Sequence, residues 1–273
     1  MFVATFLAVA VWETHRPSRE LRFPTGKRWG THAILYLLSG LVGRLALSSG
    51  PIAVALTASN RPWGLLNSPS MPWGLSVLLT ILLLDFGRYV LHLAHHRIGF
   101  LWRFHQVHHS DPDFDLTTGV RGQPLEWAFV RFANLAAVFL LAPPVGAVFI
   151  YELLSIIHTF FSHANADMPD RLDTILLRFT FTPNVHRVHH SIDVAEQNHN
   201  LGEIFTFWDR AFGTYQARSC AGKMFAVGLK EKQDQAGTLT SMLLEPLALQ
   251  RAGESQNNKP KAGGKQHLDS GFD

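Results

Sequence analysis

Long runs of apolar residues recur through the first 161 positions of the chain. The four longest occupy residues 31–56, 73–96, 125–141 and 145–161. Each run is long enough to cross the hydrocarbon core of a bilayer as a helix. Gly50 and Pro51 interrupt the first run and predict a kink, whereas Pro143 and Pro144 separate the last two and predict a helical hairpin. The pattern therefore predicts an all-α integral membrane bundle with about four transmembrane helices.

Shorter and more polar segments surround these runs. Residues 1–11 form a short apolar segment, which predicts a short or partial membrane helix, and residues 61–73 combine turn formers with Trp, which indicates a loop at the membrane surface. From about Arg251 the composition predicts a disordered tail. We therefore expect three parts: residues 1–74 with the N-terminal membrane helices and a loop, residues 75–217 with a membrane hairpin, and a C-terminal extension over 218–273.

The distribution of basic residues orients these helices. One basic cluster follows the first apolar segment and another follows the 73–96 run: Arg16, Arg19, Arg22, Lys27 and Arg28, then Arg97, Arg103 and Arg121. The loop around Asn60 contains only Arg61. Because basic loops stay on the cytoplasmic side, we expect the polar regions on either side of the hairpin to be cytoplasmic.

Composition narrows the possible chemistry. Apolar residues make up 47% of the chain and charged residues only 16%, a balance that is unusual for a soluble enzyme. The single cysteine, Cys220, excludes an intramolecular disulfide, a Cys-based zinc site and a Cys-ligated iron–sulfur cluster. The net charge of +3 is scattered, so we expect no nucleic-acid partner.

Histidines carry the main chemical signal. Most of the 15 lie between His92 and His199, in one pair and two His-x-x-His-His clusters. These are His92 and His96; His105, His108 and His109; and His186, His189 and His190. On a helix such spacing points two imidazoles the same way and turns the third aside towards a neighbouring site. Any one of them alone is more often an ordinary hydrogen-bonded side chain, but eight at repeated helical spacing predict two metal ions held close together.

Other residues near these clusters have two readings. His163 and His199 are balanced between metal ligand and local hydrogen bonder, and His95 is expected to face away from the pair. Several polar residues are equally compatible with orienting the imidazoles and with being solvated or capping helices. They are Asp85, Asp111, Glu126, Asn165, Asp193 and Asn200. Imidazole ligands suit zinc, copper, iron or nickel rather than calcium or magnesium.

Two stretches also carry a family resemblance. Residues 85–126 (DFGRYVLHLAHHRIGFLWRFHQVHHSDPDFDLTTGVRGQPLE) and segments FSHANADMP, TPNVHRVHHS and NHNLGEIFTFWDRAFGTY within 161–215 resemble the fatty acid hydroxylase and sterol desaturase superfamily of integral membrane di-iron enzymes. The resemblance implies a catalytic domain over 75–217. It also implies a set of metal ligands: His92, His96, His105, His108, His109, His163, His186, His189 and His190.

The sequence departs from the family pattern at one position. Gln123 stands in RGQPLE where relatives usually have His before the Pro-x-Glu element. Gln123 can coordinate through its amide oxygen or hold a water. A weakened second iron, altered reactivity and lost activity are also open, and His199 is a candidate for compensation.

The resemblance implies a dioxygen-dependent enzyme that hydroxylates or desaturates a lipid at two iron ions, placed in the membrane of a bacterial cell. Iron is favoured over zinc because breaking an unactivated C–H bond needs a redox metal. The chain has neither a Gly-x-Gly-x-x-Gly fingerprint nor a haem-binding domain, so a separate reductase, ferredoxin or cytochrome is expected. Sterol, fatty acid, sphingoid and ether-lipid substrates all remain open.

Two other function classes compete with this interpretation. A histidine-rich membrane metal-binding or transport protein is one alternative, but a transporter should place its ligands near the bilayer midplane, not at helix ends. A metal-dependent hydrolase is the other, and the chain lacks the His-Glu-x-x-His pattern that would supply a general base.

Overall fold

The computed structural model describes residues 1–59, 61, 63–68, 70–222, 224–235 and 237–247. The tail expected to be disordered from about Arg251 lies outside these residues. The α-helices are α1 (Phe2–His15), α2 (Thr25–Ala46), α3 (Pro51–Ala58), α4 (Trp73–Arg97), α5 (Gly99–His109), α6 (Pro124–Leu141), α7 (Val145–Ser162), α8 (Asp170–Leu176), α9 (Pro183–His189), α10 (Val194–Gln197), α11 (Phe207–Phe212) and α12 (Leu239–Leu244). Short 3₁₀ turns are η1 (Leu116–Val120), η2 (Lys230–Lys232) and η3 (Glu245–Leu247). In these ranges β-pairing is limited to isolated bridges.

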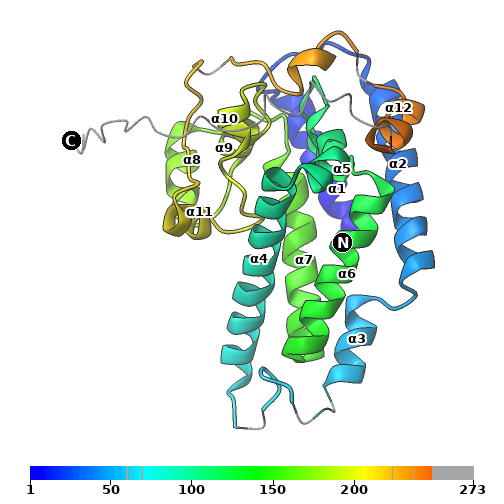
Figure 1. Ribbon diagram of the computed structural model, residues 1–273. Coiled ribbons are helices and arrows are strands. Elements are labelled where there is room, and N and C mark those ends of the chain that lie inside the picture. The colour runs from blue at the N-terminus through cyan, green and yellow to red at the C-terminus, as the bar shows by residue number, and fades with distance from the viewer. Residues whose placement is uncertain (60, 62, 69, 223, 236, 248–273) are drawn as a thin grey trace.

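Four helical segments are long and apolar enough to cross a membrane. They are Thr25–Ala58, Trp73–Arg97, Pro124–Leu141 and Val145–Ser162. In Figure 1 the corresponding helices, α2 with α3, α4, α6 and α7, form the elongated lower part of the molecule. Large apolar side chains such as Leu37, Phe132 and Phe149 are exposed on its outside, as expected for a surface that faces lipid. The predicted all-α membrane bundle with about four transmembrane helices is confirmed.

Prolines mark three helix boundaries, two of them at the breaks that the sequence predicts. Pro51 begins α3 after the interruption at 47–50, and Pro124 begins α6. Both occupy the first turn, where the missing N–H costs no helical hydrogen bond. Between α6 and α7, Ala142 adopts a left-handed conformation with φ of 43°, and Pro143 and Pro144 follow. The predicted hairpin is therefore present.

The polar segments form a cap at one end of the bundle. The chain passes from α4 into α5 with only Ile98 between them. Figure 1 shows α5 at the same end of the molecule as α8, α9, α10 and α11, whereas α3 lies at the opposite end. Both histidine-rich regions therefore lie on one side of the membrane-spanning helices.

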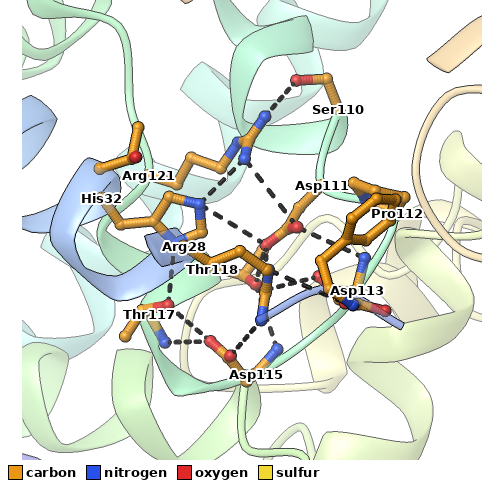
Figure 2. A network of polar contacts seen from close by, with 12 residues as sticks. Arg28, His32, Ser110, Asp111, Pro112, Asp113, Asp115, Thr117, Thr118 and Arg121 are labelled. Carbon is orange, nitrogen blue, oxygen red and sulfur yellow. Dashed lines mark hydrogen bonds and ion pairs between the residues drawn. The ribbon is translucent and has the colours of Figure 1, made fainter. Parts of the chain in front are cut away.

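A buried ionic network joins α2 to the cap (Figure 2). The Arg28 side chain is 1% exposed, and its guanidinium donates to the carboxylates of Asp115 at 2.6 Å and Asp111 at 2.8 Å. It also donates to the backbone carbonyl of Asp113 at 3.0 Å. These contacts join α2 to the segment that follows α5. Loss of the Arg28 charge would leave the buried carboxylates of Asp111 and Asp115 uncompensated, which is strongly destabilising.

Arg121 extends the network to α5. Its guanidinium donates to the carbonyl of Val107 at 2.9 Å, to the Ser110 hydroxyl at 2.8 Å and to the imidazole Nε2 of His32 at 2.9 Å. Burial opposes ionisation of Asp111, but the Arg28 and Arg121 guanidiniums outweigh it and hold the pKa of that carboxyl well below its usual range. The network thus ties down the C-terminal turn of α5, which contains His108 and His109.

We predict that Arg28→Met lowers the free energy of unfolding by about 3–5 kcal/mol, because it leaves buried aspartates without their partner. Denaturant unfolding in detergent micelles, followed by circular dichroism, measures the change. Arg44→Met is the matched control, since Arg44 is exposed near the other end of the same helix. Equal stability of the two variants would contradict a stabilising role for the network.

Candidate metal centre

Imidazoles from four helical segments converge at the boundary between the bundle and the cap. Their ring nitrogens form two groups, and the nitrogens within each group lie within 4.8 Å of one another. The first histidine group contains His92, His96, His105, His109 and His189. The second histidine group contains His108, His163, His186 and His190. The groups adjoin, because the ring of His109 stacks on that of His190 with 4.5 Å between centroids.

Helical spacing explains how α5 and α9 supply both groups. On α5, His105 and His109 are one turn apart and enter the first group, while His108 points into the second. At α9 the pattern is reversed: His186 and His190 enter the second group and His189 enters the first. Each His-x-x-His-His cluster therefore divides between two neighbouring sites.

Short distances separate the facing nitrogens. In the first group, the Nε2 atom of His92 lies 3.1 Å from the Nε2 atoms of both His105 and His189. In the second, the Nε2 atom of His163 lies 3.0 Å from that of His186 and 3.4 Å from that of His108.

In three histidines of the first group, the other ring nitrogen contacts an oxygen acceptor. The Nδ1 atoms of His92 and His189 donate to the carbonyls of Leu201 and His199 at 2.8 and 2.9 Å. The Nδ1 atom of His105 lies 2.6 Å from a carboxylate oxygen of Glu126. Acceptors at Nδ1 place the proton there and leave the Nε2 lone pair facing the group, which is the arrangement that orients histidines at metal sites.

The donor set fits bound metal ions. Burial lowers the pKa of His105, His109 and His186 well below the ordinary value, and neighbouring imidazoles lower it further. Burial likewise lowers the pKa of His189 to about 3. These imidazoles are therefore neutral, which is the form that binds metal.

Two further nitrogens support the same conclusion. The Nε2 atoms of His96 and His190 are buried and have no hydrogen-bond partner among the described residues. Converging lone pairs with no proton between them repel one another, and a cation between them removes that repulsion.

Two candidate ligands, Gln123 and His199, lie elsewhere, and so does His95, which the sequence predicts to face away from the pair. Gln123 is the N-cap of α6, where its Oε1 atom accepts hydrogen bonds from the backbone N–H groups of Leu125 at 2.6 Å and Glu126 at 3.4 Å. His95 and His199 are outside both groups, and each ring donates to a carbonyl of its own segment, Leu91 and Ala195 respectively.

Of the six polar residues considered beside the clusters, Glu126 contacts an imidazole of the first group. Asp85 accepts from the backbone of Ile204 and from the indole of Trp208. The remaining four bind backbone or the ionic network: Asp111 with Arg28, Asn165 with Arg19, Asp193 at the N-cap of α10, and Asn200 with Val185 and Gln216.

A cavity of about 480 Å³ opens beside the histidines. Residues of α4, α6 and α7 line it together with members of both histidine groups, including His92, His105 and His163. An ion pair that sequence reasoning missed crosses one wall, where Arg88 donates to Glu203 at 2.8 Å. The two residues are 115 positions apart, and neither stands in a pattern that would have linked them.

Comparisons with known proteins agree with this geometry. Residues 77–214, just over half of the chain, match the fatty acid hydroxylase family model. The chain is 32% identical over 225 residues to the ornithine lipid hydroxylase OlsE of Rhizobium tropici, covering 79% of this chain and 66% of that protein. It is 30% identical to the alkylglycerol monooxygenase of Caenorhabditis elegans, covering 57% and 30%, and to the cholesterol 25-hydroxylase of Rattus norvegicus, covering 54% and 50%.

The chain spans about a third of the length of the alkylglycerol monooxygenases that it matches. No solved structure matches it. The matched region contains all the histidines of both groups, two of the membrane-spanning segments in full and most of a third. This integral membrane protein is a member of the fatty acid hydroxylase family.

Proposed function

We propose that the protein is a membrane-bound di-iron oxygenase that uses dioxygen to hydroxylate or desaturate a lipid. The observation that carries the proposal is the convergence of two adjoining groups of neutral imidazoles beside a cavity in a membrane bundle. The hydroxylase and monooxygenase names of the relatives support the reaction class. We assign the catalytic domain to residues 75–217.

In this proposal the first histidine group holds one iron and the second holds the other. Bound iron would supply redox chemistry able to activate dioxygen for attack on a C–H bond, which zinc lacks. The protein keeps the imidazoles neutral and orients their Nε2 atoms towards the site that the metal would occupy. Glu126 and the carbonyls of Leu201 and His199 do this by accepting the Nδ1 protons.

The cavity would bind the lipid with a carbon beside the histidines. Much of its lining belongs to helices that cross the membrane, so we propose that the lipid enters from the bilayer. We place the site on the cytoplasmic side from the positive-inside rule and expect a bacterial cell membrane. Electrons would come from a separate reductase, ferredoxin or cytochrome.

Lipid analysis tests the reaction directly. Extracts from cells that express the wild-type chain should contain a lipid with one added oxygen atom or one added double bond, and extracts from cells with His189→Ala should lack it. Mass spectrometry of matched extracts measures the difference. Identical lipid profiles from the two strains, with equal amounts of protein in the membrane, would rule the proposal out.

Metal content tests the ligand assignment separately from turnover. We expect His108→Ala and His189→Ala each to lose bound iron, because each removes one proposed ligand from one of the two groups. Elemental analysis of protein purified after iron loading gives the metal-to-protein ratio. His199→Ala is the matched control, because that imidazole is outside both groups, and it should retain wild-type iron. Wild-type iron in all three variants would remove the basis for the assignment.

Gln123→His tests the departure from the family pattern. Because Gln123 caps α6, we expect this variant to leave the iron content unchanged and to lower the free energy of unfolding by about 1 kcal/mol. Iron analysis and denaturant unfolding on the same preparation give both quantities. A rise in bound iron or in product would instead identify position 123 as a vacant ligand site.

A further inference from the structure

The cavity extends along the bundle well beyond the histidines. On α7 one helical face lines it through Glu152, Ser155 and Thr159, which are three to four residues apart, and the same face leads to His163. On α6 the lining runs from Glu126 to Asn134. At 1.5 Å per residue, Asn134 lies about 12 Å along its helix from Glu126, and Glu152 lies about 16 Å along its helix from His163.

Asn134 and Glu152 meet at this distant part of the cavity. The Nδ2 atom of Asn134 donates to the Oε1 atom of Glu152 at 3.0 Å, which links α6 to α7. Among the described residues, the second carboxylate oxygen of Glu152 and the amide oxygen of Asn134 have no hydrogen-bond partner. Both residues line the cavity. Neither of these two oxygens is fully buried, so a ligand in the cavity can reach them.

Nearby positive charges are engaged elsewhere. The Arg88 guanidinium is paired with Glu203, whose carboxylate also accepts from the hydroxyls of Tyr151 and Ser155. The Arg131 guanidinium donates to the carbonyls of Leu47 at 3.3 Å and Ser49 at 2.7 Å. Glu152 has no ion-pair partner within 4.0 Å among the residues that the structure describes.

A carboxyl group in a membrane-spanning helix is costly, and such residues usually mark the path or binding site of a polar ligand. The free atoms of this pair are mainly acceptors, so they favour a ligand group that donates hydrogen bonds. A plain hydrocarbon segment at this position would leave them unsatisfied in a water-poor cavity.

We propose that Asn134 and Glu152 bind a hydrogen-bond-donating polar group of the lipid, a hydroxyl or an ammonium. This proposal rests on the proposed function and narrows its substrate class to amphiphiles. The lipid would lie along α6 and α7, with its donor at this pair and the carbon to be attacked beside the histidines. The spacing of about 12–16 Å along the helices would then set which carbon reaches the metal centre.

Binding of four probes of equal chain length tests the proposal. Hexadecanol carries a hydroxyl donor, hexadecylamine an ammonium donor, hexadecyl methyl ether an acceptor without a donor, and hexadecane neither. Each competes with tritiated hexadecanol for metal-free protein in detergent micelles. We expect at least one of the two donor probes to compete at a concentration about tenfold lower than the ether and the hydrocarbon.

Variants locate the preference within the cavity. Glu152→Leu and Asn134→Leu should each reduce the preference for donors severalfold, whereas Phe132→Leu should keep it, because Phe132 is exposed on the outer surface of α6. Partition of a probe into micelles is the same for every variant, so the comparison isolates binding by the protein. Glu152→Gln distinguishes the two donor probes, because loss of the negative charge weakens binding of the ammonium more than binding of the hydroxyl.

The outcomes are distinct. Equal competition by all four probes against the wild-type protein would overturn the proposal, even if the variants do not fold. A donor preference that survives in both Glu152→Leu and Asn134→Leu would also overturn it. The assay needs neither iron nor turnover, so a donor preference without any lipid product would refute the oxygenase while leaving this binding site in place.

Discussion

Repulsion among buried imidazole lone pairs is the constraint on which the centre depends. Carbonyl and carboxylate acceptors hold protons on Nδ1, so the Nε2 atoms of His92, His105 and His189 face one another without a proton between them. Burial keeps the rings outside the spanning helices neutral, so they cannot relieve this strain by protonation. A bound cation would relieve the repulsion. The electrostatics of the metal-free protein therefore support the metal chemistry that we propose.

The rest of the fold keeps these rings in place against their mutual repulsion. The C-terminal turn of α5 is fixed through Arg121 and the aspartates that Arg28 neutralises, and α4 continues almost directly into α5. Since the network is buried, water does not screen it, and a change at α2 would be transmitted to the histidines. The membrane helices are thus both the anchor of the protein and the support of its centre.

The cavity brings polar groups into a part of the protein that otherwise faces lipid. The Arg88–Glu203 pair joins α4 to the loop that follows α10, and its charges are satisfied by hydroxyls from α7. Asn134 and Glu152, by contrast, keep unused acceptors. Arg88 and Glu203 therefore stabilise the cavity wall, whereas Asn134 and Glu152 are suited to binding a ligand. This contrast is why we assign an amphiphile to the cavity.

The sequence alone determined the membrane bundle, the hairpin at Pro143 and Pro144, and the histidines with helical spacing, because hydrophobic length, proline geometry and helical periodicity are local properties. Only the tertiary structure decided how those histidines divide into two groups, and it placed Gln123 at a helix N-cap and His199 outside both groups. It also revealed the carbonyl acceptors of Leu201 and His199 and the partnership of Arg88 with Glu203. Backbone carbonyls have no signature in a sequence, and contacts between distant segments depend on packing that a single sequence does not encode locally.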